Sequence, residues 1–369
     1  MKDIIEWLND SSYIPPLPPA CEMCARGSKL VVLITGLCPA NCFYCPLSFK
    51  KGGKDVIYAD EWKLDDENDT AKLIQEAEYI EAEGAGITGG DPLIVWRRVK
   101  RYIHVLKDEY GSSFHIHLYT SALKNWEYIP EIVSAGLDEI RFHPEPIYWK
   151  NMDESPIRKA IELALENPVD AAIEIPVIPG VREDIISIIE WADRIGIKWV
   201  NLNELEFSER NADNFIRRGF DVKDDTSAAV KGSEETAKEI LKGIEEKQLD
   251  IGVHYCSSSF KDGIQLRNRI MRRAKNIVKP HEVITEDGTL LFGIIQPSNE
   301  MNLENLESLL KNKYGINEFH INSMKNRVET SIPIIRKLAC RVRGEDIKCF
   351  IIEEYPTADR LEVERIPLP

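Results

Sequence analysis

The sequence predicts an α/β protein whose main part is a partial or full (β/α) barrel, followed by a small C-terminal α+β domain. Short apolar segments alternate about six times with segments of helical period, which is the pattern of a parallel sheet with right-handed crossovers. After Pro280 the pattern changes to hairpins around one helix. We therefore divide the chain into a lead-in (1–30), a barrel core (31–279) and an accessory domain (280–369).

The expected barrel strands are continuous apolar runs, as in strands that are buried on both faces. The first run is LVVLIT, residues 30–35. Similar runs lie at 85–88, 114–120, 139–143, 171–178, 199–205 and 250–255. Alternation alone does not separate a closed barrel from an open sheet. In both, functional groups are expected at the carboxyl ends of the strands.

The expected helices lie between these runs, in the segments 68–83, 93–111, 183–196 and 233–249. In the first of them the apolar residues share one face, and Asn68 can cap its start and Gly84 its end. The polar stretch 221–235 is expected to be a loop before the last helix.

The accessory domain shows two hairpin patterns and one amphipathic helix, in the ranges 282–295, 331–354 and 302–315. The first hairpin turns at the Asp-Gly pair 287–288, and the second is expected to turn at 344–345. In that second hairpin Cys340 faces Cys349. These two cysteines are expected to be a packed pair or a disulfide rather than metal ligands.

Composition places the chain among globular proteins, with 43% hydrophobic and 30% charged residues. It contains no run of about 18 apolar residues and no secretory signal, so we expect a cytoplasmic protein that does not span a membrane. Its net charge of −15 excludes binding of nucleic acid by the overall field, although a local basic patch can still bind it.

Cysteines cluster near the start of the chain. Five of the eight lie between positions 21 and 45, which in a chain without a signal peptide predicts metal ligands rather than disulfides. Cys38, Cys42 and Cys45 form a C-x3-C-x2-C motif directly after the first strand. Three thiolates on one loop can hold three irons of a cubane and leave the fourth iron open to an outside molecule. The alternatives are a zinc site, which usually has four Cys or His ligands, and cysteines that only pack.

With the aromatic Tyr44 before the third cysteine, this motif resembles the radical S-adenosylmethionine superfamily. The resemblance covers roughly residues 30–260 and is nearest to the branch related to pyruvate formate-lyase activating enzyme. It implies a 4Fe–4S cluster on the three cysteines and S-adenosylmethionine bound to the open iron. It also implies cleavage of that cofactor to a 5′-deoxyadenosyl radical, with ferredoxin or flavodoxin as the electron donor.

Three further segments resemble cofactor-binding parts of this family. The run Thr88-Gly89-Gly90-Asp91 looks like the Gly-Gly-Glu-Pro motif, whose carbonyls receive the amino group of the cofactor; Asp91 stands where Glu is usual. The other candidate cofactor ligands are Thr120 and Ser121 after the third strand, and Val177 and Pro179 in a segment expected to lie against adenine. Caps and plain turns are the alternative interpretation of these segments.

Arg141, His143 and Glu145 follow one another at the end of the fourth strand, where we expect them over the mouth of the barrel as candidate substrate ligands. The alternative for His143 is a structural histidine.

Cys21, Cys24 and Cys256 are left without an assignment by the family motif. We expect them to ligate a second Fe–S cluster, with substrate or His254 as the fourth ligand. The alternatives are a zinc ion or no metal.

Residues 264–279 are strongly basic and include Arg267 and Arg272. On a helix they could bind phosphates of RNA or of a small substrate, or they could form a solvated face. Our first hypothesis is therefore a radical enzyme that modifies RNA nucleosides. The second is a radical enzyme that activates or modifies a protein or peptide. The third is a non-catalytic Fe–S or zinc protein.

Overall fold

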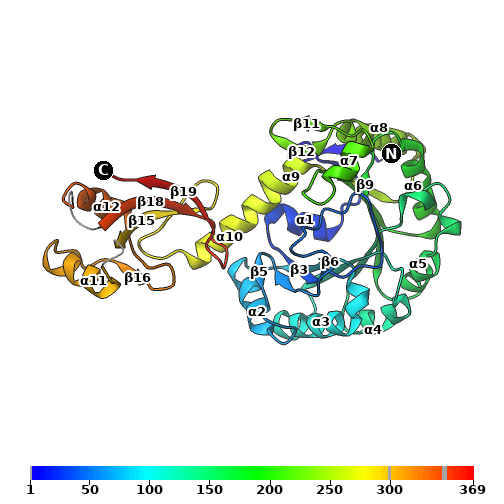
Figure 1. Ribbon diagram of the computed structural model, residues 1–369. Helices are drawn as coiled ribbons and strands as arrows, with labels where there is room; N and C mark the ends of the chain where they lie inside the picture. Colours follow the sequence, from blue (N-terminus) through cyan, green and yellow to red (C-terminus); the bar gives the residue numbers. More distant parts are fainter. Residues whose placement is uncertain (1, 298–300, 343–346) are drawn as a thin grey trace. The chain divides into compact units, whose positions relative to one another are not determined.

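The computed structural model describes residues 2–297, 301–342 and 347–369. It divides into two compact units, Met1–Leu266 and Arg267–Pro369 (Figure 1). The division lies at the start of the basic helix, so that helix belongs to the second unit.

The first unit is built on parallel strands that follow one another in space in the order β13-β10-β9-β8-β7-β6-β3. Their bounds are β3 Lys29–Thr35, β6 Gly84–Gly89, β7 His115–Thr120, β8 Glu139–Phe142, β9 Asp170–Val177, β10 Trp199–Glu204 and β13 Gly252–Cys256. Short antiparallel strands extend both edges: β2 (Ser12–Ile14) and β1 (Ile5–Glu6) beyond β13, and β4 (Tyr58–Ala59) and β5 (Trp62–Lys63) beyond β3. Within the described residues no pair joins these two edges, so the sheet is a partial barrel.

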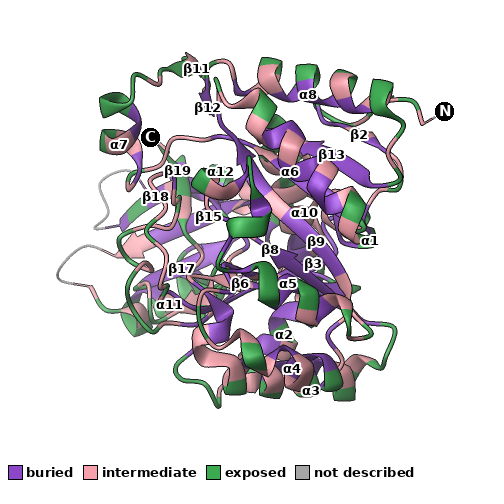
Figure 2. Ribbon diagram, turned by 90° about the vertical axis from the view of Figure 1, so that its right-hand side faces the viewer, coloured by how far each residue is buried: buried purple, intermediate pink, exposed green. Residues whose placement is uncertain are grey.

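Helices follow the strands and surround the sheet (Figure 1). They are α2 Thr70–Tyr79, α3 Trp96–Tyr110, α4 Ile129–Ser134, α5 Arg158–Leu165, α6 Arg182–Ile195, α7 Ala212–Arg217, α8 Ser233–Lys247 and α9 Ser258–Phe260. Short 3₁₀ helices precede or follow some of them, at Pro92–Val95 (η1), Trp126–Tyr128, Pro146–Tyr148 and Met152–Glu154. In α3 the buried side chains Val99, Tyr102, Ile103 and Leu106 recur every three or four residues. Figure 2 shows the buried residues concentrated on the strands of the sheet.

Three local expectations in this unit are wrong. Helix α2 starts at Thr70 after Asp69, and Asn68 instead accepts a hydrogen bond from Arg101 of α3 at 2.5 Å. Gly84 does not end α2 but opens β6, because the chain has already turned at Glu81. The stretch 221–235 is not all loop, since it forms the hairpin β11 (Val222–Asp224) and β12 (Ser227–Val230). Asp224 supports that turn by accepting hydrogen bonds from the backbone and hydroxyl of Thr226.

The lead-in is part of the barrel. Between β2 and β3 the chain forms α1 (Pro19–Arg26), which packs against β3, β6 and the π-helix η5 (Lys261–Leu266). Figure 1 shows α1 inside the ring of strands and helices, and its Cys21 touches Asn201 of β10.

The second unit is an antiparallel sheet in the order β16-β17-β15-β18-β19, with β14 paired to β15. Its elements are α10 Arg267–Ile277, β14 Val283–Ile284, β15 Leu290–Pro297, α11 Leu303–Asn312, β16 His320–Asn322, β17 Arg327–Thr330, α12 Ile332–Ala339, β18 Ile347–Glu354 and β19 Glu362–Pro367. The hairpin at 282–295 and the helix within 302–315 are confirmed.

The predicted second hairpin in this unit is wrong. Residues 332–339 form α12, because Ile335, Leu338 and Ala339 recur at helical spacing and are buried together. Cys340 is exposed at the end of that helix, whereas Cys349 is buried on β18 opposite Ile295. They form no disulfide, and the turn expected at 344–345 lies outside the described residues.

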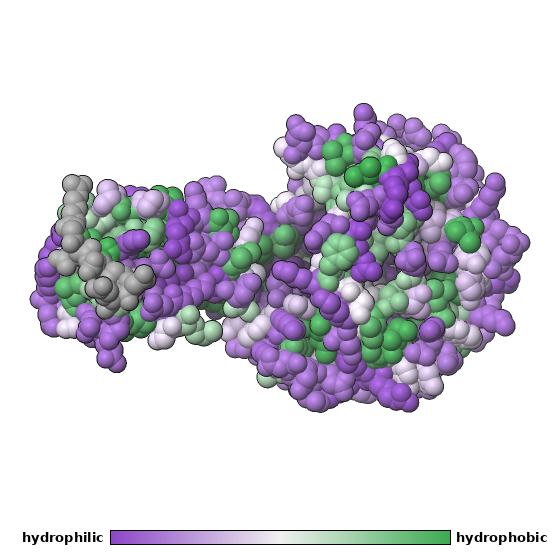
Figure 3. All heavy atoms as spheres, in the orientation of Figure 1, coloured by the Kyte–Doolittle hydropathy of each residue, from purple (hydrophilic) through white to green (hydrophobic). Residues whose placement is uncertain are grey.

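No helix in the described residues has both the length and the apolar character needed to cross a bilayer. The face shown in Figure 3 is mainly hydrophilic, and its hydrophobic residues gather in small patches. This distribution agrees with the high share of charged residues in the sequence.

Candidate active site

The cysteine motif lies on the loop that leaves the carboxyl end of β3. Cys38 is exposed and Cys42 and Cys45 are partly buried. Backbone hydrogen bonds shape the loop, from Cys45 N to Cys42 O at 3.2 Å and from Gly36 N to Lys54 O at 2.8 Å. The motif thus places three thiols on one loop at the carboxyl end of the first barrel strand.

The residue type of this motif suits an Fe–S cluster, because such clusters are held by soft thiolate ligands. A structural zinc site usually has four Cys or His ligands, whereas the motif supplies three thiols. Among the described residues, the one group of three potential ligand atoms within 4.8 Å of one another lies in the second unit, at His281, Glu282 and Glu329.

Gly89 and Gly90 bring the loop after β6 against the start of the cysteine loop. Gly90 N donates to Thr35 O and Asp91 N donates to Leu37 O, both at 2.7 Å. A Cβ on Gly89 would lie 2.1 Å from Thr35 O, and a Cβ on Gly90 would lie 2.1 Å from Leu37 O. Gly89 also has φ +138°, which disfavours a side chain. The two glycines are therefore needed to join the loops.

We expect Gly90→Ala to displace the cysteine loop, because its methyl group would overlap the Leu37 carbonyl. Cluster content after anaerobic reconstitution should fall by at least half, and the unfolding free energy should fall by about 2 kcal/mol. Iron analysis and thermal denaturation measure the two effects. Gly243→Ala in α8 is the matched control, because its Cβ meets neighbours only at 3.5 Å. A Gly90→Ala variant with full iron content would contradict this role.

Asp91 is a buried anchor between strands. Its carboxylate accepts hydrogen bonds from Leu93 N at 3.1 Å, from the Thr120 hydroxyl at 2.8 Å, and from both the backbone and the hydroxyl of Ser121. Burial raises the pKa of Asp91, while the two hydroxyl donors oppose that rise. The hydroxyl protons of Thr120 and Ser121 are thus already donated within the protein, and only their lone pairs remain for a cofactor. Thr88, one of the proposed cofactor ligands, is partly buried at the end of β6.

Tyr44 connects the cysteine loop to β8. Its hydroxyl lies 2.9 Å from His143 Nε2, and His143 Nδ1 lies 2.6 Å from Glu174 O, so His143 donates to that carbonyl and accepts from Tyr44. Asn211 donates to Tyr44 O at 3.1 Å. Burial raises the pKa of Tyr44 and lowers that of His143, which keeps both groups neutral.

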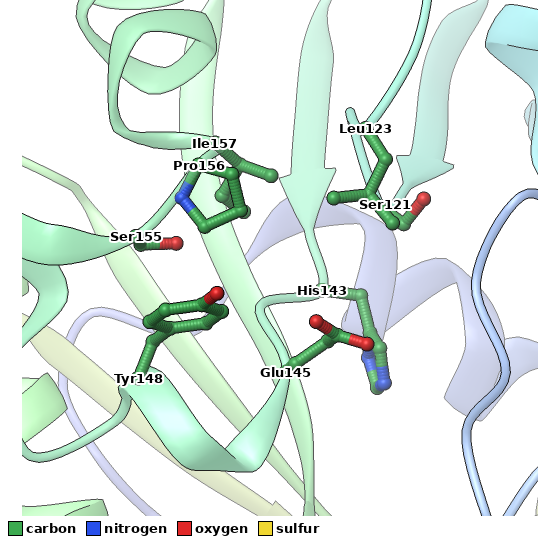
Figure 4. Close-up of a pocket in the computed structure, with 8 residues that line it drawn as sticks. All are labelled: Ser121, Leu123, His143, Glu145, Tyr148, Ser155, Pro156 and Ile157. Carbon is green, nitrogen blue, oxygen red and sulfur yellow. The ribbon is translucent and has the colours of Figure 1, made fainter.

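A small hollow lies beside this chain of hydrogen bonds (Figure 4). Its lining residues come from the carboxyl ends of β7 and β8 and from the segment after them: Ser121, Leu123, His143, Glu145, Tyr148, Ser155, Pro156 and Ile157. The buried hydroxyl of Ser155 has no hydrogen-bond partner among the described residues. The structure thus brings Ser121, His143 and Glu145 to one hollow.

The segment that is expected to lie against adenine, which contains Val177 and Pro179, is hydrogen-bonded to the start of α8. Val177 is fully buried in the apolar core, and its carbonyl accepts a hydrogen bond from the Ser233 hydroxyl at 2.8 Å. Pro179 follows, half-buried, beside Gly232. The Val177 carbonyl is therefore oriented toward the start of α8.

Arg141 lies lower than expected, within β8 and inside the barrel rather than over its mouth. It is 3% exposed and forms ion pairs with Glu139 and with Glu174, the latter at 2.7 Å. Asn201 and Asn203 of β10 donate to the same Glu174 carboxylate at 3.2 and 2.9 Å. The positive charge of Arg141 is thus balanced by two carboxylates inside the barrel.

Sequence reasoning missed this polar lumen, although a signal was present. Within otherwise apolar strands, polar residues recur at every second position, which marks one face of a strand. These positions are His115, His117 and Tyr119 on β7, Glu139 and Arg141 on β8, Glu174 on β9, Asn201 and Asn203 on β10, and His254 and Cys256 on β13.

The basic helix is partly engaged within its own unit. Arg267 donates to Glu286 O at 2.7 Å and lies 3.5 Å from the Asp287 carboxylate. Arg273 is buried and donates to Pro356 O, so it does not face outward as expected. Arg272 is partly buried on the same helix.

Comparison with known proteins adds three findings. Residues 32–192 match the family described as the radical SAM superfamily, and residues 288–368 match a domain of unknown function. A protein of Methanocaldococcus jannaschii is 42% identical over 360 residues, which covers 95% of this chain and 93% of that protein. Its name assigns it provisionally as a glycyl-radical enzyme activating enzyme.

Two solved structures are similar at lower identity. SuiB of Streptococcus suis bound to S-adenosylmethionine is 12% identical with a TM-score of 0.42, and the match covers 62% of this chain and 50% of SuiB. The methyltransferase TsrM of Kitasatospora setae, solved with cobalamin and a [4Fe-4S] cluster, is 11% identical with a TM-score of 0.37, and the match covers 72% and 56%.

Proposed function

Because the chain belongs to the radical S-adenosylmethionine superfamily, we propose that it generates a 5′-deoxyadenosyl radical and uses it to activate a protein by forming a radical on a glycine. It is an enzyme that uses a 4Fe–4S cluster and S-adenosylmethionine.

In this proposal Cys38, Cys42 and Cys45 hold the cluster. A reduced 4Fe–4S cluster bound there would supply the electron that cleaves the sulfonium of S-adenosylmethionine to methionine and a 5′-deoxyadenosyl radical. Gly89 and Gly90 fix the loop that faces the cysteines. The carboxyl ends of β7 and β8, near His143, are the place for the cofactor or the reacting residue, because functional groups of such barrels gather at that end of the strands.

A protein substrate is favoured by one observation, the relative that matches nearly the whole chain. The radical would take one hydrogen atom from a glycine Cα, which gives 5′-deoxyadenosine and a glycyl radical. A reduced ferredoxin or flavodoxin would supply the electron. RNA is the less favoured substrate, because Arg267 and Arg273 of the basic helix already bind groups of their own unit.

The test uses the reduced, anaerobically reconstituted full chain with S-adenosylmethionine. It is incubated with proteins, or separately with RNA, from cells that lack this chain and were grown on glycine deuterated at Cα. We expect deuterium in 5′-deoxyadenosine only with the protein fraction, together with the doublet signal of a glycyl radical in electron paramagnetic resonance. Consumption of the cofactor that responds to RNA and not to protein would overturn the proposal. An enzyme carrying Cys42→Ala is the blank.

A further inference from the structure

We propose that the barrel lumen of this protein holds a second iron–sulfur cluster, bound by Cys21, Cys24 and Cys256 and closed by His254. This site is separate from the loop after β3 and lies among the polar residues of the lumen.

The first two thiols come from one helix. Cys21 and Cys24 stand three residues apart on α1, so their side chains lie on the same face of it. That face is turned into the lumen, because Cys21 Sγ lies 3.9 Å from Asn201 Oδ1 of β10 and 3.9 Å from Arg141 Nη2 of β8. Cys21 is 6% exposed.

The third thiol, that of Cys256, lies on β13, the last barrel strand in the sequence. Asn201, the residue that Cys21 touches, pairs in register with His254 of β13. Cys256 stands two residues further along β13 and shares its lumen face with His254. Helix α1 also packs against η5, which follows Cys256 closely in the chain. The fold thus gathers thiols that are more than 230 positions apart in sequence.

Charged side chains lie beside these thiols. Arg141 Nη2 lies 3.9 Å from Cys21 Sγ and is itself paired with Glu139 and Glu174. Lys261 stands on η5, which follows Cys256 in the chain, and is paired with Glu206. Cys21 is thus beside charged groups of the lumen rather than in the apolar core.

His254 supplies a fourth ligand. It is 2% exposed, and both of its ring nitrogens lack a hydrogen-bond partner among the described residues. A buried imidazole without partners is costly, and a metal bond removes that cost. Histidine replaces cysteine as a ligand in some Fe–S centres.

The deciding measurement is the iron, sulfide and zinc content of full-length chains reconstituted anaerobically. The wild type should hold about eight irons and eight sulfides, and the triple variant Cys38→Ala/Cys42→Ala/Cys45→Ala about four of each, as expected for two 4Fe–4S clusters. The double variant Cys24→Ala/Cys256→Ala should also hold about four. The reduced triple variant should give a resonance signal that S-adenosylmethionine leaves unchanged, because His254 closes the coordination.

Two results would overturn the proposal: a wild type with about four irons beside a triple variant with none, or one zinc per chain in the triple variant. Cys349→Ala, a buried cysteine of the second unit, is the control and should keep the wild-type content. Should the double variant fail to fold, the triple variant alone still decides. The iron count does not depend on the substrate, so failure of the proposed function would leave this result intact.

Discussion

Replacing Cys42 by alanine is expected to abolish the formation of 5′-deoxyadenosine. The cluster must keep three thiolates on one loop, and this substitution removes the middle one. The rate should fall by at least 10³-fold, which corresponds to about 4 kcal/mol of activation free energy. Cys38→Ala and Cys45→Ala should behave in the same way. Chromatography of 5′-deoxyadenosine after dithionite reduction measures the effect.

The matched control for these variants is Cys340→Ala. Cys340 is exposed at the end of α12, so its replacement should leave the rate unchanged. If any one of the three loop variants kept the wild-type rate, the assignment of the cluster ligands would be wrong.

The largest expected effect on stability is at Glu174. Arg141 is buried between Glu139 and Glu174, so Glu174→Gln would remove one of its two countercharges. Removing one partner of a buried ion pair costs about 3 kcal/mol or more of unfolding free energy. Chemical denaturation of the reduced chain would show this loss. Glu246→Gln, at an exposed position of α8, is the control and should change the unfolding free energy by less than about 0.5 kcal/mol.

The same pair predicts a dependence on pH. Burial raises the pKa of Glu174. The contacts of its carboxylate with Arg141, Asn203 and Asn201 lower the pKa by more than burial raises it, so the net shift is downward. The stabilisation is therefore present above the pKa of Glu174 in the unfolded chain and is lost as the pH falls through the lower folded value. The triple variant Glu139→Gln/Arg141→Met/Glu174→Gln, which removes all three charges, should regain part of the stability at neutral pH. A single variant as stable as wild type would show that the pair is dispensable.

The strands and the cysteine loop could be predicted because their signals are local. LVVLIT is apolar at five of its six positions, and three cysteines follow it on one short loop. Long helices such as α3 and α6 show a clear period for the same reason. The open edge of the barrel could not be predicted, since alternation does not report how the last strand meets the first.

Other features depend on distant contacts. The segment 332–339 is rich in isoleucine and was predicted as a strand, but packing of Ile335 and Leu338 on β15 and β18 makes it a helix. The position of Arg141 near the end of its strand predicts a side chain over the mouth of the barrel. That position in the sequence does not reveal the ion pair with Glu174 on the next strand, which keeps Arg141 inside. The hydroxyls of Thr120 and Ser121 bind Asp91, which is about 30 residues earlier.

The pairing of β2 with β13 has a consequence for synthesis on the ribosome. Residues 12–14 emerge early, but their partner strand at 253–255 is made some 240 residues later. Contacts so distant in sequence form slowly and late. The N-terminal strands are therefore expected to pair with β13 only after the other barrel strands have been made, and insertion of metal into the lumen is expected to precede or accompany that pairing.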